Sequence, residues 1–528
     1  MVPTGYAIAE SFRSRIRFIS RAGIDLLSEG ERARTSLRGL RGRNYTFAFT
    51  RENPLKPGQL IRRWGAHLLQ PEDGASIAAF RVMFGALMAW EVARYFTLSR
   101  IESYYIEPSF HFTYPFFGFL NPWPGVGMYV HFAAMGILAL FIAAGLFYRV
   151  TASLFFLLFS YVFLLDKAFY LNHFYLILLI SFLLAIIPSH RATSLDRLLF
   201  FRSQPPLVPR WSILLLRAQV FILYFYAGLA KLNPDWLQGE PIRMWLAART
   251  DFPLVGSLFT EEWMVFLFAY GALLFDLAIG FLLVWKRSRP LAIVLAGAFH
   301  FINANLFQIG IFPYLAFAAT LIFAEPDWPR RMYSRLKSIV TQQRVSPSSP
   351  SRRFSTGGSG SWQTNRSATW AVLAIGHLYL LSQLLIPLRH FLYPGNVSWT
   401  EEGHRFSWHM KLRDKEATLR VFVTDPRSGE TWEVSPAVDL SAKQLDEMST
   451  RPDMVLQYAH YLVERLSMQG ASRPIIRVDH RVSLNGRPYQ PLIDPAVDLA
   501  TVPVGLAPAN WILPLETPHE GGWAQGAY

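Results

Sequence analysis

The chain contains no cysteine and few charged residues for its length. None of its 528 residues is a cysteine, which excludes disulfide bonds, thiolate catalysis and cysteine-ligated zinc or iron–sulfur sites. Only 17% of the residues are charged, whereas 52% are hydrophobic and 15% are aromatic. This balance is typical of a polytopic membrane protein rather than of a soluble enzyme.

Two further patterns are missing. The first 63 residues are arginine-rich and carry no long apolar core, so we expect no cleavable signal peptide. No compact metal-ligand spacing such as HExxH occurs either, and we therefore expect no metal site.

Apolar runs predict about nine membrane-spanning helices, since roughly 20 apolar residues cross a hydrocarbon core. They lie near residues 76–97, 126–147, 150–166, 172–188, 211–231, 263–285, 291–307, 309–324 and 369–388. Nine spans put every arginine-rich connector on one side of the membrane, as expected if arginine and lysine favour cytoplasmic loops. The net charge of +14 is thereby explained without nucleic acid as a partner.

We therefore expect an α-helical polytopic membrane protein with a C-terminal α+β extramembrane domain. The expected parts are an arginine-rich cytoplasmic segment (1–70), eight transmembrane helices carrying the site (71–335), a flexible cytoplasmic linker (336–368), a ninth transmembrane helix (369–390) and a non-cytoplasmic domain (391–528).

Within the C-terminal domain, turn residues and alternation predict β-hairpins over residues 417–434 and 477–493. Apolar spacing predicts helices over residues 441–448 and 451–466, the second with an apolar face.

Polar residues at the ends of spans are functional candidates, because lipid makes an ionisable group costly. Four groups lie at the predicted non-cytoplasmic ends: Asp166 with Lys167, Asn172 with His173, Lys231, and His300 with Asn303 and Asn305. Each group alone has a plainer interpretation. The lysine can snorkel to headgroups, Asp166 and Lys167 can form a local ion pair, and the histidines and asparagines can join helices. Their arrival at one depth of the membrane favours a shared site.

Lys231 has features beyond those of a membrane anchor. It ends the apolar stretch 222-ILYFYAGLAK-231, with Tyr224 and Gly228 on the same helix face. The glycine leaves room for a ligand or for a neighbouring backbone. In apolar surroundings an amine loses its proton more readily, so we expect Lys231 to be neutral and to act as a base.

Two other features of the membrane region are open to interpretation. The aromatic loop 110-FHFTYPFFGFLNPWP-124 is either an interfacial belt or the wall of a site for a flat apolar ligand. Asp276 is a further buried carboxylate, expected to be a structural partner for a neighbouring helix.

The chain resembles the vitamin K-dependent gamma-carboxylase family from about residue 75 to about residue 505. The resemblance rests on 165-LDKAFYLNHFYL-176, 224-YFYAGLAKLNPDWLQGE-240, 275-FDLAIGFLL-283, 299-FHFINANLFQIGIFPY-314, 399-WTEEGHRFSWHM-410 and 493-IDPAVDL-499. It is closest to the bacterial members, and this implies a bacterial inner-membrane protein with its active site and C-terminal domain on the non-cytoplasmic side.

The resemblance implies an enzyme that oxidises vitamin K hydroquinone (or a menaquinol) with O2 to the 2,3-epoxide. The base so generated removes a γ-proton from a glutamate of a protein substrate, and CO2 adds there. Lys231, His173 and His300 match the family's catalytic residues. Asn172, Tyr224, Asn303 and Asp166 are the expected cofactor-binding residues. Trp399, His404, Arg405 and Trp408 are candidate contacts to the protein substrate, with packing between the domain and the membrane as the alternative.

Three functions stay open from the sequence. The first is the glutamyl carboxylase, the second a quinone oxidase or epoxidase without carboxylation, and the third a non-catalytic membrane binding or transport protein. One departure from the animal enzymes is visible beside the proposed base, where a second lysine is replaced by Ala230.

Overall fold

The computed structural model of the chain describes residues 57–307, 309–341, 366–469 and 473–516. It divides into two compact units, Met1–Arg62 and Arg63–Tyr528, and the features below belong to the second, apart from residues 57–62. Most of the predicted N-terminal segment and most of the predicted linker lie outside the described residues.

Helices form at all nine predicted positions. They are α3 (Ala75–Thr97), α4 (Gly127–Ala144), α5 (Tyr148–Leu165), α6 (Asn172–Ile186), α8 (Arg210–Ala230), α11 (Glu262–Val284), α12 (Arg289–Leu306), α13 (Phe312–Thr320) and α15 (Arg366–Leu385). Within the described ranges, six helical segments are long and apolar enough to cross a membrane: α3, α4, α5, α8, α11 and Trp370–Leu392, which contains most of α15. Helices α6 and α13 are shorter, and α12 is not among the six. The chain is thus a multi-pass membrane protein, but the count of nine spans is not confirmed.

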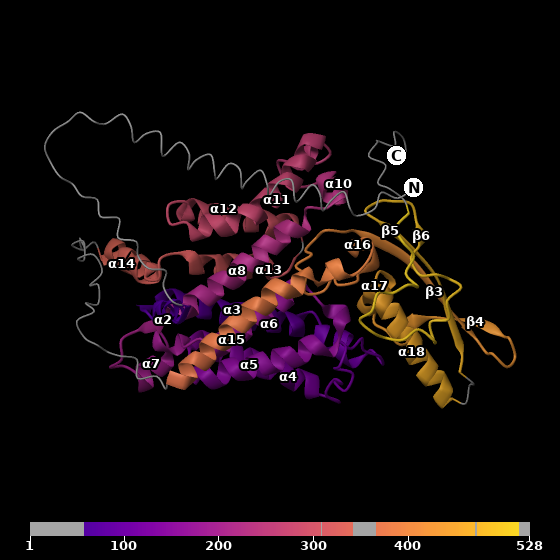
Figure 1. Cartoon of the computed structure of the whole chain (residues 1–528), viewed down its shortest axis with the longest axis horizontal. Helices are drawn as coiled ribbons and strands as arrows, with labels where there is room; N and C mark the ends of the chain where they lie inside the picture. Colours follow the sequence, from indigo (N-terminus) through magenta and orange to yellow (C-terminus); the bar gives the residue numbers. More distant parts are fainter. Residues whose placement is uncertain (1–56, 308, 342–365, 470–472, 517–528) are drawn as a thin grey trace. The chain divides into compact units, whose positions relative to one another are not determined.

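The apolar helices pack as a connected bundle (Figure 1). Helix α3 lies against α4, α4 against α5, and α5 against α6. Among the later helices, α8 contacts both α11 and α15, and α12 contacts both α11 and α13. Helix α13 returns to α3 and so closes the contact between the two groups of helices.

Shorter elements precede, connect or follow these helices. They are α2 (Pro57–Leu68), α7 (Leu195–Phe200), α9 (Pro234–Leu237), α10 (Ile242–Ala247), α14 (Trp328–Thr341) and α16 (Val397–Thr400), with β1 (Pro71–Asp73) paired to β2 (Leu207–Pro209). The turn after α8 is capped by Asn233, whose side chain accepts a hydrogen bond from the Trp236 amide. Pro234 at the first turn suits this helix start, and the cap fixes Trp236 in the short helix that follows Lys231.

The C-terminal region forms a four-stranded antiparallel sheet with two helices. Strands β3 (Lys415–Thr424), β4 (Thr431–Val434), β5 (Ile475–Leu484) and β6 (Gln490–Pro491) lie in the order β4-β3-β5-β6. Both predicted hairpins are confirmed. The centre of the sheet is the long β3–β5 pairing, in which Lys415 faces Leu484 and Thr424 faces Ile475.

Helices α17 (Ala442–Ser449) and α18 (Pro452–Met468) occupy the predicted helical positions. A capping box at Ser441 and Gln444 starts α17. The apolar face of α18 packs with buried residues of β3 and β5, and Figure 1 shows the strands with α17 and α18 in orange to yellow. Tyr458 and Leu462 are buried in this core, as the sequence predicts.

A buried ion pair ties the turn between β5 and β6 to the segment that follows α8. The Arg487 guanidinium donates to both carboxylate oxygens of Asp235, at 2.6 and 2.8 Å. Asn485 donates a further hydrogen bond of 2.7 Å to the same carboxylate. The hairpin turn is therefore fixed beside the end of α8.

We expect Asp235→Asn to loosen this connection, because breaking one partner of a buried ion pair costs about 3–5 kcal/mol. The expected result is a lower unfolding temperature in detergent and faster proteolysis within the C-terminal region. Glu433→Gln is the control, since the Arg420–Glu433 pair is exposed and its loss should change neither quantity. Equal behaviour of the two variants would contradict this role for Asp235.

Candidate functional site

A cavity lies where α8, α11 and α12 meet Met410 and Lys411 of the C-terminal region. It encloses about 1190 Å³ of atom-free space, including the part open at its mouth. Its wall is mainly apolar and aromatic, and its polar lining residues are Tyr224, Lys231, Asp276, His300, Asn303 and Lys411. We call it the Lys231 cavity. Four of the residues predicted for the site, Lys231, Tyr224, His300 and Asn303, are brought together here.

Lys231 forms an ion pair with Asp276 inside this cavity. Its Nζ lies 2.7 Å from Asp276 Oδ2 and donates a second hydrogen bond of 3.2 Å to the Ala227 carbonyl. The ammonium also lies 5.1 Å from the centre of the Trp236 ring, a distance that suits a cation–π contact. Both charged residues are 5% exposed. The sequence predicts a neutral amine in apolar surroundings, whereas the structure places the Asp276 carboxylate against it. The helix partner expected for Asp276 is thus Lys231 itself.

Gly228 explains how the two charges meet. A Cβ atom built on Gly228 would lie 2.8 Å from the backbone nitrogen and from two side-chain atoms of Leu277. Of the two roles open for this glycine, the structure has the close approach of a neighbouring backbone. Helix α11 can thus lie directly against α8, and Asp276, next to Leu277, faces Lys231 one turn above the glycine.

Tyr224 and His300 form a second polar group in the cavity. The Tyr224 hydroxyl lies 2.7 Å from His300 Nε2 and 3.0 Å from Thr320 Oγ1. Thr320 already donates its proton to the Ala316 carbonyl. With the Thr320 proton on that carbonyl, the hydroxyl of Tyr224 donates to Thr320, and Nε2 of a neutral His300 donates to Tyr224.

This assignment leaves His300 Nδ1 as an acceptor. Nδ1 is buried and has no hydrogen-bond partner among the residues that the structure describes. Buried polar atoms are normally paired, so an unpaired ring nitrogen on a cavity wall is suited to accept a hydrogen bond from a ligand hydroxyl.

Of three further predicted polar residues, Asn303 lines this cavity, whereas Asn172 and His173 are not among the residues described as lining it. The His173 ring lies 6.2 Å from the ring of Phe312, which lines the cavity. Asn172 donates to the His409 carbonyl and so joins α6 to the C-terminal region. Asn303 is on the wall, but its amide nitrogen donates to Phe299 of its own helix.

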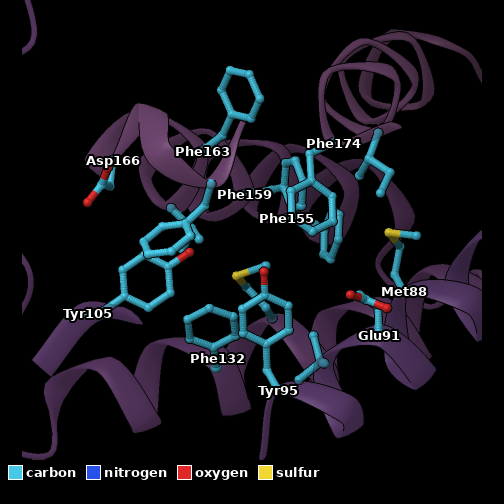
Figure 2. Close-up of a pocket in the computed structure, with 15 residues that line it drawn as sticks. Met88, Glu91, Tyr95, Tyr105, Phe132, Phe155, Phe159, Phe163, Asp166 and Phe174 are labelled. Atoms are coloured by element: carbon cyan, nitrogen blue, oxygen red, sulfur yellow. The ribbon is translucent and has the colours of Figure 1, made fainter. Parts of the chain in front are cut away.

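Asp166 belongs to a different cavity. Figure 2 shows this second cavity, with Asp166 and Glu91 on opposite sides and aromatic rings between them. It encloses about 530 Å³ of atom-free space between α3, α4, α5 and α6. The Asp166 carboxylate accepts hydrogen bonds from the Ala168 amide and from Gln444. The structure therefore does not bring Asp166 to Lys231, because these bonds hold it at the base of the C-terminal region.

The structure also bears on two further interpretations, the local ion pair of Asp166 with Lys167 and the aromatic loop 110–124. Asp166 and Lys167 do not pair with each other in the described contacts, since Lys167 lies 2.7 Å from Asp453. The aromatic loop 110–124 supplies none of the residues described as lining the Lys231 cavity. Its Phe112 packs in the core of the C-terminal region, whereas Phe116 is exposed. The aromatic wall comes instead from Trp236, Trp245, Phe268, Phe299, Phe307 and Phe312.

The residues predicted to contact a protein substrate lie mostly inside the fold. Trp399 and Trp408 are both 0% exposed. Trp408 packs on Tyr175 of α6, with ring centres 4.9 Å apart, and Trp399 donates to the Leu513 carbonyl. Arg405 is partly buried and pairs with Asp453 at 2.9 Å. The Trp408 contact fits the packing alternative, in which this segment anchors the C-terminal region on the membrane helices, whereas the contacts of Trp399 and Arg405 lie within the C-terminal region.

His404 belongs to a buried charge cluster around Glu401. Glu401 pairs with Arg413 and Lys415. Burial alone would raise the pKa of Glu401, but these two cations outweigh it and hold that pKa well below its usual range. Burial lowers the pKa of Lys415 to about 8, although Glu401 opposes the shift. Burial likewise lowers the pKa of His404 well below its ordinary value, with Arg413 adding to the effect, so His404 is a neutral imidazole in this cluster.

Two family models match the chain in adjoining regions. The HTTM domain matches residues 69–328, and the lumenal domain of vitamin K-dependent gamma-carboxylase matches residues 368–518. No solved structure matches the chain.

The first match covers the helical region that holds the Lys231 cavity, and the second covers the C-terminal sheet and its helices. The chain therefore belongs to the vitamin K-dependent gamma-carboxylase family.

Sequence reasoning missed Trp236, Trp245 and Lys411, which all line the Lys231 cavity. Trp236 follows Lys231 closely, and its position after a Pro-containing cap was a usable signal. Trp245 and Lys411 come from segments distant in the sequence, with the Lys411 Nζ 5.0 Å from the centre of the Trp245 ring. No local pattern marks that contact.

We expect Gly228→Ala to separate α8 from α11, because the added methyl group has no room beside Leu277. Overpacking of this kind costs about 1–3 kcal/mol, so the unfolding temperature in detergent should fall. Gly271→Ala on α11 is the control: a Cβ there meets nothing within 4 Å, and the stability should hold or rise slightly. A Gly228→Ala protein as stable as the control would contradict the close approach of the two helices.

Proposed function

We propose that this protein is a membrane glutamyl gamma-carboxylase that works with a reduced quinone of the vitamin K type. The observation that carries the proposal is the Lys231 cavity. A buried lysine–aspartate pair and a histidine with an unpaired ring nitrogen converge there in an otherwise aromatic and apolar wall.

The lining residues fit a reduced naphthoquinone. A flat ring with an apolar side chain suits aromatic walls such as those of Trp236, Phe299 and Phe312. His300 Nδ1 would accept a hydrogen bond from one ring hydroxyl, and the Lys231–Asp276 pair would meet a second polar group. Reduced vitamin K, when bound, supplies through its oxidation by O2 the strong base that removes a γ-proton from glutamate before CO2 adds.

The chain's own residues would orient the ring and move its proton. A hydroquinone hydroxyl has acidity near that of tyrosine, with a pKa of about 10, so it needs a nearby group to take its proton. Lys231 is that group in our proposal. Tyr224 and Thr320 would hold the tautomer of His300 in which Nδ1 accepts. The apolar wall would keep water from the reacting groups.

The glutamate would arrive from the side of the C-terminal region. Met410 and Lys411 of that region line the Lys231 cavity. Burial lowers the pKa of the Lys411 amine, although Asp414 opposes the shift. A lysine at this place would attract the carboxylate of a substrate glutamate. With the distribution of arginine in the sequence, we propose a non-cytoplasmic site in a bacterial inner membrane.

A second candidate is a quinone oxidase or epoxidase without carboxylation. It is favoured by one observation, namely that Trp399 and Trp408 are fully buried and so are not free to hold a peptide. The same cavity would serve this reaction, and the two candidates differ only in the fate of glutamate.

The test is a product assay on purified protein in nanodiscs. The reaction contains vitamin K hydroquinone, O2, labelled bicarbonate and a glutamate-containing peptide. We expect epoxide and fixed label from the wild type, and both should fall by at least about 100-fold in Lys231→Ala, as is usual when a proton-transfer group is removed.

Lys286→Ala is the matched control, because Lys286 is exposed beyond the end of α11 and should leave both products unchanged. Epoxide without fixed label would favour the second candidate. Neither product from the wild type, with reduced quinone present throughout, would contradict both candidates and leave a binding or transport protein.

A further inference from the structure

Asp276 is a charged residue in the middle of a membrane helix. It follows 272-ALLF-275 on α11 and precedes 277-LAIGF-281, and its carboxylate is almost fully buried. Such a group is costly in an apolar setting unless it is paired. Its described ion-pair partner is Lys231 at 2.7 Å.

The other titratable side chains of this region come from three elements. Tyr224 lies on α8 and His300 on α12, and they are bonded to each other. Lys411 lies in the C-terminal region against Trp245. Among the described hydrogen bonds and ion pairs, none joins these three groups to Asp276, so the pair with Lys231 is its main charge contact.

This pairing creates a chemical difficulty for the proposed function. An ammonium that is bonded to a carboxylate has no lone pair with which to take a proton. A neutral lysine beside an ionised Asp276 would leave one unbalanced negative charge in an apolar wall. Taking a proton from a ring hydroxyl would then place a second anion beside it, which is less favourable still.

We propose that Asp276 is the group that finally holds the proton taken from the hydroquinone, and that Lys231 passes this proton to it. The inference rests on the proposed function. As the O–H bond of the bound hydroxyl breaks, a new N–H bond forms at Lys231. A different N–H bond of Lys231 breaks, and its proton forms an O–H bond on Asp276 Oδ2.

The charges balance at every stage of this transfer. Before it, the Lys231 cation is paired with the Asp276 anion. After it, Asp276 is a neutral acid, Lys231 is still a cation, and the negative charge lies on the oxygen that gave up its proton. No net charge is created in the apolar cavity, and the ammonium stabilises whichever anion is present. Asp276 acts through Lys231, so it is a positioning and proton-holding residue.

Infrared difference spectroscopy without O2 tests this directly, because no turnover occurs. Wild-type protein in nanodiscs is mixed with vitamin K hydroquinone, and binding is followed in parallel by quenching of tryptophan fluorescence, since Trp236 and Trp245 line the cavity. We expect binding to produce the carbonyl band of a protonated carboxylic acid. The band should shift when the protein contains isotope-labelled aspartate.

The variant Asp276→Asn should lose this band, while Glu433→Gln, an exposed acid in the C-terminal sheet, should keep it. The labelled wild-type spectrum shows without any variant that the acid is an aspartate, and if Asp276→Asn does not fold, Asp276→Glu, which keeps a carboxyl group, should give a band that labelled aspartate no longer shifts. In aerobic assays, Asp276→Asn should also slow epoxide formation by about 100-fold and alter its pH profile, which a purely structural role would not do.

Two results would overturn the inference while leaving the proposed function intact. One is quenching without any acid band in the wild type, which would leave the proton on Lys231 or His300. The other is a band that persists in Asp276→Asn. Absence of quenching in the wild type would instead show that the hydroquinone does not bind, and would overturn the proposed function together with this inference.

Discussion

The buried contact between Lys231 and Asp276 is the interaction on which the candidate site depends. Two opposite charges, each costly alone in an apolar environment, are held 2.7 Å apart on neighbouring helices. The pair fixes which faces of α8 and α11 pack together. It also puts two charged groups into a cavity whose walls are otherwise mainly apolar. The proposed function and the packing of the two helices therefore depend on the same contact.

Several local features converge to make this contact possible. Gly228 removes the side chain that would keep α11 away. The cap at Asn233 ends the polar turn and directs Trp236 against the ammonium. The Asp235–Arg487 pair then fixes the C-terminal hairpin to the same turn. The short segment after α8 thus joins the membrane helices to the C-terminal region.

The sequence predicts local structure well and distant contacts poorly. Apolar runs locate all nine helices, and turn residues locate both hairpins, because these signals depend on neighbours along the chain. The family is also evident from long motifs. The β3–β5 pairing and the facing of Asp276 toward Lys231 depend on packing between distant segments, so no local pattern contains them. The surroundings of Lys231 and the grouping of Asp166 with it were inferred from position along a span, whereas the structure pairs Lys231 with Asp276 and puts Asp166 on another cavity. Of the two interpretations of residues 110–124, the wall of the Lys231 cavity is not the one the structure has.

The two cavities in the membrane helices also separate polar residues that the sequence predicts to share one site. Polar residues at one predicted depth do not all face one site. The Lys231 cavity gathers Lys231, Asp276 and His300, whereas the second cavity lies between α3, α4, α5 and α6 with Glu91 and Asp166 on its wall (Figure 2). The most direct measurement is an experimental map of the protein in nanodiscs with vitamin K hydroquinone under anaerobic conditions. Our account predicts ligand density between Trp236 and His300, with the Lys231–Asp276 pair intact. Density confined to the second cavity, or a Lys231 that has turned away from Asp276, would contradict it.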